Sequence, residues 1–297
     1  MSGLARTVGR LPSPAAAWLG RRLGELGWAI FGQRRRLALA NLARAFPEVP
    51  EPERRRLCRE CWRHLGVTAV ELCQLLVRPA EQLLARVTIE GREHLDAVMA
   101  HHGRALVLSA HLGNWEVLAA ASRLVGYRLA VVARPLDRPG LERLAREIRR
   151  RAGVEVIAKR DALGAVLAAL RRGAMVGILL DQNAVRREGV FVPFFGHLAS
   201  TSRALAVLAL RTRTPVVPIF AYRRPGGGHR VVVHPAIDPG ARATGPEPSG
   251  PRALRSEAAI VELTAQCTRA VEAAIREHPE QWLWIHDRWR TRPAAGA

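Results

Sequence analysis

The sequence predicts an α/β protein with a mostly parallel central sheet flanked by helices, preceded by a helical amino-terminal segment. Two observations carry this prediction. Beyond about residue 86, short apolar runs alternate with longer segments of helical periodicity, whereas residues 1–85 show helical patterns throughout. Strands that alternate with helices are typical of right-handed crossovers and of a parallel sheet covered on both faces.

Residues 1–85 are predicted to form a helical lead that associates with membranes, and residues 86–297 an α/β domain. We expect the two to make one continuous structural unit. Within the lead, "RRRLALANLARAFP" predicts a helix that ends at Pro47. A second helix is predicted to start after the Pro/Glu-rich "PEVPEPE" and to continue to about Val77.

The elements of the α/β domain follow in order. "RVTIEG" predicts a strand, "REHLDAVMAHH" a helix and "RALVLSA" a buried strand that leads into the helix "VLAAASRLV". The strands "RLAVVAR", "VEVIA" and "AMVGILLD" then alternate with two helices. After a further helix, "PVVPIFAYRR" and "HRVVVHPAI" flank "PGGG" and predict a hairpin at the far edge of the sheet. A surface loop from Pro239 to Pro251 and a helix from about Leu254 to His278 follow.

The chain is strongly basic, with a formal net charge of +20 that arginine supplies almost alone, since Lys159 is its single lysine. A positive field attracts anions, which include nucleic acid, acidic lipid headgroups and an acidic carrier protein. The arginine clusters lie in predicted helices and are not interleaved with aromatic residues that would stack on bases. This arrangement disfavours nucleic-acid binding.

A C-x-x-C pair, Cys58 and Cys61, lies on a predicted helix with His64 three residues further on. These residues raise the possibility of a metal site, but no second pair completes a tetrahedral ligand set. The sequence favours small buried residues instead, and we expect neither a metal nor a cofactor.

The segment from Leu11 to Phe31 is apolar but carries Arg21, Arg22 and Glu25, so it falls short of the roughly 20 uncharged residues that cross a bilayer. Two interpretations remain. Its tryptophans and arginines suit a helix lying in the membrane interface, and its apolar residues equally suit a helix docked on the protein's own core.

The stretch "SAHLGNWEV", residues 109–117, places His111 at the carboxyl end of a predicted strand and Glu116 in the first turn of the next helix. Open α/β sheets bind ligands at this edge. A histidine titrates near neutral pH, and a carboxylate on its other ring nitrogen would fix the tautomer and stabilise the imidazolium. Gly113 allows a tight turn and Asn114 is predicted to cap the helix. The alternative is an ordinary helix start, whose glutamate interacts with the helix dipole.

Several other catalytic signatures are absent from the sequence. It contains no G-x-S-x-G, G-x-x-x-x-G-K-[ST], G-x-G-x-x-G or H-E-x-x-H. Serine hydrolases with a nucleophile elbow, P-loop enzymes, dinucleotide enzymes and zincins are therefore disfavoured. A histidine base that acts on an acceptor hydroxyl without a covalent intermediate remains.

The sequence contains five stretches in this order: "SAHLGNWE", "ARPLDRPGLERL", "ILLDQNAVRREGVFVPFFG", "PVVPIFAYRR" and "PEQWLWIHDRW". Together they resemble the bacterial lipid A late acyltransferase family. That family lies within the lysophospholipid and glycerolipid acyltransferase superfamily. "RRRLALANLARAFPE" resembles its amino-terminal signature, so the likeness covers nearly the whole chain. The resemblance implies transfer of an acyl chain from an acyl carrier protein thioester to a glycolipid hydroxyl. The reaction would take place at the cytoplasmic face of the bacterial inner membrane, with the enzyme peripheral or weakly anchored and its positive surface held on anionic lipid.

The resemblance also implies roles for particular residues. His111 would be the general base and Glu116 its partner. Arg134 would neutralise a phosphate or the developing oxyanion, with a solvated strand end as the alternative. Further substrate contacts are expected from Asn114, Asp181 and Gln182, the last two as sugar or headgroup contacts or as supports of their loop. Phe194 and Phe195 would wall an acyl-chain groove, with core packing as the alternative.

Three other functions fit the same residues. One is acylation of a different membrane lipid, such as a lysophospholipid, a phosphoinositide mannoside or an ornithine-type lipid. Another is a peripheral membrane protein that has lost its activity, which the intact His111 and Glu116 disfavour. A thioesterase in which His111 activates water is the third, but it would have no need of a lipid-facing lead.

Overall fold

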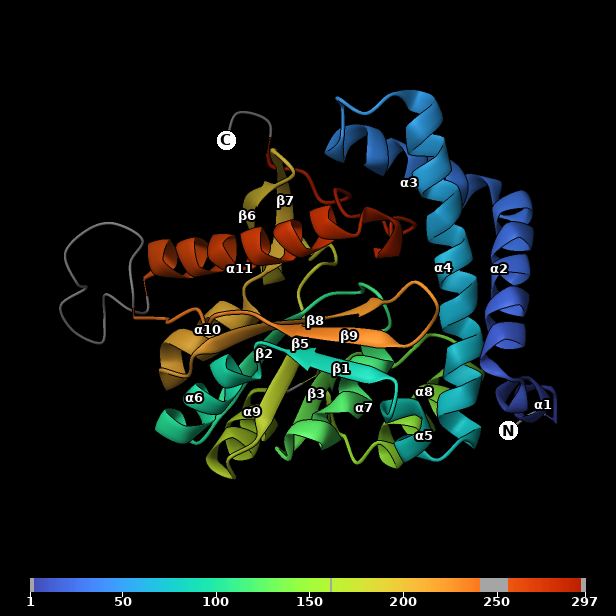
Figure 1. The fold of residues 1–297 in the computed structure, drawn as a ribbon. Helices are drawn as coiled ribbons and strands as arrows, with labels where there is room; N and C mark the ends of the chain where they lie inside the picture. Colours follow the sequence, from blue (N-terminus) through green and yellow to red (C-terminus); the bar gives the residue numbers. More distant parts are fainter. Residues whose placement is uncertain (1–2, 161, 241–255, 295–297) are drawn as a thin grey trace.

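The computed structural model describes residues 3–160, 162–240 and 256–294. Its centre is a seven-stranded sheet in the order β1-β9-β8-β2-β5-β3-β4 (Figure 1). Strands β8, β2, β5, β3 and β4 run parallel, β9 is antiparallel to β8, and β1 is parallel to β9. The predicted α/β class with a mostly parallel sheet is confirmed. The strands are β1 (Val87–Glu90), β2 (Ala105–Ser109), β3 (Leu129–Ala133), β4 (Glu155–Ala158), β5 (Met175–Leu179), β8 (Val216–Arg223) and β9 (His229–Val233).

Helices cover both faces of the sheet. Alternate residues of β2 point to opposite faces, so Leu106 and Leu108 pack on one side and Val107 on the other. Every residue of β2 is buried, as expected for a strand covered twice. On the Leu106 side lie α9 (Ala162–Arg171), α10 (Ala204–Thr212) and α11 (Glu257–Glu277). On the Val107 side lie α6 (Arg92–His102), α7 (Trp115–Val125) and α8 (Pro139–Arg151).

A second, two-stranded sheet joins β6 (Gly189–Phe194) and β7 (His197–Ser202), which run antiparallel after the short helix η1 (Arg186–Glu188). Figure 1 shows this hairpin beside α11, on the side of the molecule away from α6 and α7. Its buried residues join the same core as α11. The hairpin therefore extends the apolar layer that covers one face of the central sheet.

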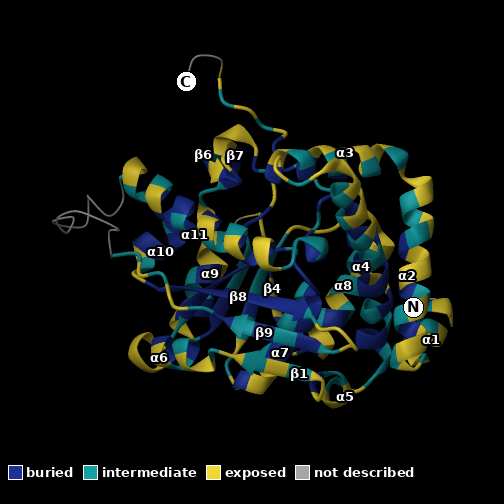
Figure 2. Ribbon diagram, turned by 45° about the horizontal axis from the view of Figure 1, so that its top comes forward, coloured by how far each residue is buried: buried dark blue, intermediate teal, exposed yellow. Residues whose placement is uncertain are grey.

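The amino-terminal lead consists of α1 (Gly3–Arg10), α2 (Ser13–Ile30), α3 (Gly32–Ala45), α4 (Glu51–Val77) and α5 (Ala80–Leu84). Helices α2 and α4 lie side by side (Figure 1). They approach closely because both carry glycine at the contact: a Cβ on Gly66 would lie 2.0 Å from the carbonyl oxygen of Gly20. Figure 2 shows that the outer side of α2 is exposed, whereas the middle of the sheet at β8 is buried.

The structure corrects three details of the predicted elements. Helix α4 begins at Glu51, inside "PEVPEPE", because a proline is well tolerated in the first turn of a helix. The predicted hairpin is β8–β9, but β1 pairs with β9 and forms the edge of the sheet. The last helix spans Glu257–Glu277 and is slightly shorter than predicted. Most of the predicted surface loop lies outside the described residues.

Candidate active site

The ends of two neighbouring strands bring His111 and Asp181 together. Strands β2 and β5 pair in parallel with Ser109 opposite Leu179, so the turns that follow them leave the sheet at the same edge. The amide of Leu180 donates to the carbonyl oxygen of Ser109 at 3.0 Å and holds the second turn against the first. His111 and Asp181 each lie two residues beyond their strand. The edge where ligands are expected thus carries a histidine and a carboxylate.

Asp181 is the hydrogen-bond partner of His111. Its Oδ1 lies 2.9 Å from Nδ1 of the imidazole, and its Oδ2 accepts from the backbone amide of His111 at 3.1 Å. The indole Nε1 of Trp282 donates to the same Oδ2 at 2.8 Å. A carboxylate accepts and does not donate, so Nδ1 carries the proton in the neutral imidazole and Nε2 has the free lone pair.

The two side chains differ in their access to solvent. The Asp181 side chain is 1% exposed and that of His111 is 19% exposed. Burial by itself raises the pKa of Asp181, but the charge and hydrogen bond of His111, together with Trp282, hold that pKa at about 2. The carboxylate is therefore ionised at neutral pH. His111 is flanked by the Trp115 ring, 5.0 Å away between centroids, and by Gln182 Nε2, 3.4 Å from its own Nε2.

Glu116 lies in the first turn of the next helix, as predicted, but its side chain does not contact His111. It is buried in the first turn of α7, where its Oε2 and Oε1 accept from Nε and Nη2 of Arg149 on α8 at 3.1 and 2.5 Å. Within the described parts of the chain it has no hydrogen bond to His111. The predicted His111–Glu116 contact is wrong, because α7 starts at Trp115 and directs Glu116 toward α8. Asp181, predicted as a substrate or support residue, takes that contact.

Asn114 caps α7 as predicted, since its Oδ1 accepts from the amides of Glu116 and Val117 at 3.2 Å. Its Nδ2 donates to Glu71 of α4 at 2.7 Å, and the side chain is fully buried. A direct contact between Asn114 and a substrate, which the sequence also suggested, is therefore inconsistent with this structure.

Gly113 is required in the turn for two reasons. Its φ is +60°, and a Cβ there would lie 1.7 Å from the carbonyl oxygen of Ala221 in β8. Glycine thus suits the tight turn that the sequence predicts here, but the turn approaches β8 and does not bring Glu116 to His111.

Arg134 lies at the surface near the candidate site. Arg134 follows β3 at the same edge, two strands from β2. It is exposed, and its Nη2 lies 2.9 Å from Oδ1 of Asp137.

Phe194 and Phe195 are buried and pack in one aromatic cluster. The expected acyl groove at these two residues is wrong for this structure, because their rings contact Trp282, Trp284, Trp289 and Phe46.

A polar cluster of His64 and Glu71 on α4 and Arg223 on β8 supports the back of the turn that carries His111. Nε2 of His64 lies 2.9 Å from the carbonyl oxygen of Gly113. Glu71 accepts from Nε and Nη2 of Arg223 at 3.1 and 2.5 Å. Burial and the neighbouring Arg223 keep the pKa of His64 well below its usual value, so its ring is neutral at pH 7.

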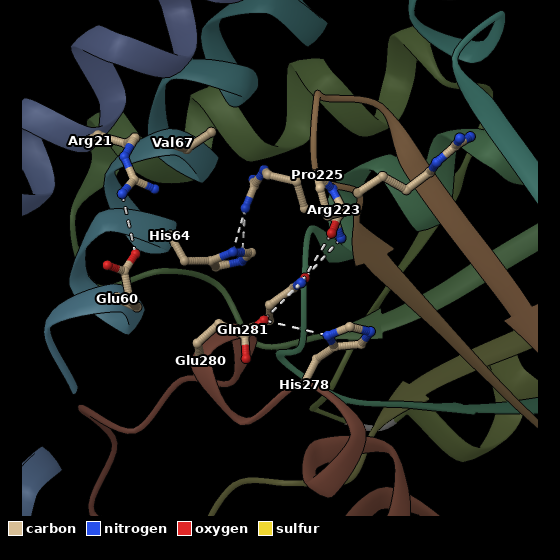
Figure 3. A pocket seen from close by; sticks show the side chains of 10 residues that line it. Arg21, Glu60, His64, Val67, Arg223, Pro225, His278, Glu280 and Gln281 are labelled. Atoms are coloured by element: carbon tan, nitrogen blue, oxygen red, sulfur yellow. Dashed lines mark hydrogen bonds and ion pairs between the residues drawn. The ribbon is translucent and has the colours of Figure 1, made fainter. Parts of the chain in front are cut away.

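A hollow of about 220 Å³ opens beside this cluster, between α4 and the end of β8. Figure 3 shows His64 and Arg223 pointing toward one another on its wall, with Gln281 below them. The sequence linked His64 to the C-x-x-C pair, but Cys58 and Cys61 are free buried thiols, as the alternative interpretation expected.

The outer side of α2 carries apolar residues at helical spacing. Trp18, Leu26 and Ile30 are 60%, 55% and 62% exposed, and Arg22 lies in the same row. No helix in the described part of the chain combines the length and apolar character needed to span a bilayer.

Comparison with known proteins identifies the family. The family model for bacterial lipid A biosynthesis acyltransferases matches residues 2–291. The lipid A biosynthesis lauroyltransferase of Escherichia coli is 28% identical over 293 residues, which cover 98% of this chain and 90% of that protein. The myristoyltransferase of the same organism is 26% identical, over 98% of this chain and 85% of its own length. The chain therefore belongs to the bacterial lipid A biosynthesis acyltransferase family and is an acyltransferase.

Proposed function

We propose that this acyltransferase moves a fatty acyl chain from an acyl carrier protein thioester to a hydroxyl of a lipid A precursor, with His111 as the general base. The observation that supports this role is the orientation of the imidazole. A buried, ionised Asp181 holds Nδ1, and Nε2 is on the other side of a ring that is 19% exposed, 3.4 Å from Nε2 of Gln182. A neutral histidine held in this tautomer can accept a proton at Nε2.

The reaction is a direct transfer with both substrates bound. Nε2 of His111 takes the proton of the acceptor hydroxyl while the hydroxyl oxygen attacks the carbonyl carbon of the thioester. The resulting imidazolium is stabilised by Asp181. When the tetrahedral intermediate collapses, the C–S bond breaks, and the imidazolium returns the proton to the departing thiolate. No acyl group is attached to the enzyme at any step.

Glu116 has a different part in this proposal from the one that the sequence suggested. Its paired contact with Arg149 joins the first turn of α7 to α8. Because Asn114 caps the same turn, the ion pair fixes the end of the segment that carries His111. Glu116 thus acts through the position of the turn.

Charged groups along the same edge suit anionic substrates. Arg134 follows β3, and Lys159 follows β4. Arg186 and Arg187 follow β5 in η1. A phosphate-bearing glycolipid and an acidic carrier protein are both attracted by such a field.

The lead attaches the protein to the membrane surface in this proposal. Trp18, Leu26 and Ile30 would enter the interface while neighbouring arginines contact anionic headgroups, as in interfacial helices. This placement fits the inner membrane, where the acceptor would lie with its reacting hydroxyl toward the cytoplasm.

The test is a reconstituted assay of the purified protein. A labelled acyl chain is supplied either on acyl carrier protein or on coenzyme A, and the acceptor is either a lipid A precursor or a lysophospholipid. We expect transfer to the lipid A precursor with the carrier-protein donor, none with His111→Ala, and no label on denatured protein after acid quench. Transfer to the lysophospholipid alone would overturn the acceptor, and label retained on the protein would overturn the direct mechanism.

A further inference from the structure

The carboxyl-terminal segment around Trp282 contacts both turns of the candidate site. The carbonyl oxygen of Gln281 accepts from the amide of Gly113 at 3.0 Å, and the amide of Leu283 donates to the carbonyl oxygen of His111 at 3.2 Å. Between these two backbone bonds, the Trp282 indole donates to Asp181. One short segment, distant from both turns in the sequence, therefore joins the ends of β2 and β5.

We propose that Trp282 is a positioning residue that sets the orientation of Asp181 and thereby the basicity of His111. This inference rests on the proposed role of His111 as base. It assigns to Trp282 a function beyond packing, since its ring lies in the aromatic cluster but its single N–H reaches the carboxylate.

The indole bonds one carboxylate oxygen and thereby helps to fix the direction of the other. Oδ1 faces Nδ1 of the imidazole, and Oδ2 is shared by the His111 amide and Trp282. Trp282 is 1% exposed and so held by its surroundings, with Trp284 perpendicular to it at 4.5 Å and Phe194 at 5.7 Å. A rigid donor on Oδ2 prevents rotation of the carboxylate, which keeps Oδ1 aligned with the imidazole.

The indole and the imidazolium compete for the negative charge of one carboxylate. Each donor to Asp181 withdraws charge from the other, so the Trp282 bond weakens the attraction between Asp181 and a protonated His111. Removing the indole N–H should leave a stronger acceptor for the imidazolium and raise the pKa of His111. It should also loosen the carboxylate and lower the rate.

Two other titratable groups, His286 and Arg288, lie near Asp181, and both belong to the carboxyl-terminal segment that carries Trp282. His286 is kept neutral because burial lowers its pKa, and its Nε2 accepts from the amide of Asn183 at 3.0 Å. Arg288 is fully buried; burial lowers its pKa to about 10, so it stays charged at neutral pH, and its Nη1 donates to the carbonyl oxygen of Ser200 at 2.7 Å. Asp287 is the next charged group and acts on His286. None of these bonds involves the Trp282 indole N–H.

The test compares Trp282→Phe with Trp284→Phe. Both substitutions remove one indole from the same cluster, but the N–H of Trp284 donates to the carbonyl oxygen of Pro279 rather than to Asp181. The imidazole pKa of His111 is measured by NMR of histidine-labelled protein, with the resonance assigned by its loss in His111→Asn. We expect Trp282→Phe to raise this pKa by about 0.5 or more and Trp284→Phe to leave it unchanged.

Activity provides the second measurement. With Trp282→Phe, kcat should fall roughly 10- to 100-fold with KM nearly constant, and the acid limb of the kcat/KM profile should move to higher pH. In an Asp181→Asn background, Trp282→Phe should cause no further change in the His111 pKa. Equal His111 pKa values in Trp282→Phe and the parent would overturn the proposal.

A measurement on the unsubstituted protein covers the case in which Trp282→Phe does not fold. The Nε1–H resonance of Trp282 in ¹⁵N-labelled protein should shift with the titration of His111, whereas that of Trp284 should not. A Trp282 resonance that ignores this titration would overturn the proposal. These NMR measurements need no substrate, so they test the link between Trp282 and His111 independently of the reaction. A protein that shows this link but does not acylate lipid A precursors would reject the proposed function and keep this inference.

Discussion

Asp181 binds His111 through both carboxylate oxygens, one at Nδ1 of the ring and the other at the backbone amide. Asp181 therefore holds both the imidazole ring of His111 and the backbone turn that carries it. Because Asp181 follows β5 and His111 follows β2, the relationship depends on these strands being neighbours in the sheet. The predictions below test what this arrangement and its supports contribute.

Glu116→Gln should act mainly on stability. It removes the charge from a buried ion pair and leaves the Arg149 guanidinium without its partner, which costs about 3 kcal/mol of unfolding free energy. Urea unfolding followed by circular dichroism measures this loss. The control Glu53→Gln, in an exposed pair with Arg56, should leave the unfolding free energy nearly unchanged. Equal stability of Glu116→Gln and the parent would contradict a structural role for the pair.

Gly113→Ala should damage the turn that carries His111. The substitution puts a side chain into left-handed backbone, at a cost of about 1–3 kcal/mol, and drives its Cβ against the carbonyl oxygen of Ala221. Gly103→Ala is a matched control, since its φ is +61° but no atom lies within 4 Å of the added Cβ. Thermal unfolding should show a clearly larger fall in Tm for Gly113→Ala. A similar fall for both variants would exclude a special role for the β8 contact.

A triple variant of the exposed side of α2 should release the protein from membranes. It combines Trp18→Ser, Leu26→Ser and Ile30→Ser. Burial of each large apolar side chain in the interface contributes about 1.5–3 kcal/mol, so the triple variant should bind at least about 100-fold more weakly. Sedimentation with phosphatidylglycerol-containing vesicles measures the binding. Leu163→Ser, at an exposed leucine of α9, is the control. Unchanged binding of the triple variant would place the membrane contact elsewhere.

Stability should fall in acid partly through Asp181. Its folded-state pKa of about 2 lies below the ordinary value of 3.8, so this carboxylate stabilises the fold above about pH 4 and loses that contribution as the pH falls through 2. The linkage predicts a loss of roughly 1 kcal/mol between pH 5 and pH 3 from this one group. Asp181→Asn should show a correspondingly smaller decrease over that interval in urea unfolding. The same decrease in both proteins would mean that the Asp181 pKa is not depressed.

Much of the fold follows from local patterns in the sequence. The alternation of apolar runs and helical segments predicts the parallel sheet, and the turn at His111 can be identified from one glycine and one capping asparagine. These features depend on residues close together in the chain. Helix boundaries near Pro50 and Pro52 are less predictable, since proline both ends helices and fits their first turn.

The partner of His111 could not be predicted from spacing. Glu116 is five residues away, but the direction of its side chain depends on where α7 begins. Asp181 is 70 residues away and becomes a neighbour because β5 inserts beside β2, ahead of β3 and β4 in the sheet order. The donor from Trp282 is more distant still. Similarly, the composition of "GVFVPFFG" fits a lipid groove and a core equally, and contacts with the carboxyl-terminal tryptophans decide for the core.

The most direct test of the central claim is mass spectrometry of lipid A from a bacterial strain that lacks its late acyltransferases. The strain would express the parent protein, His111→Ala, Asp181→Asn or Glu116→Gln, with equal amounts of folded protein verified in each case. We predict a secondary acyl chain with the parent and with folded Glu116→Gln, and its loss with His111→Ala and Asp181→Asn. A chain that persists with Asp181→Asn and disappears with Glu116→Gln would contradict the assignment of Asp181 as the partner of the base.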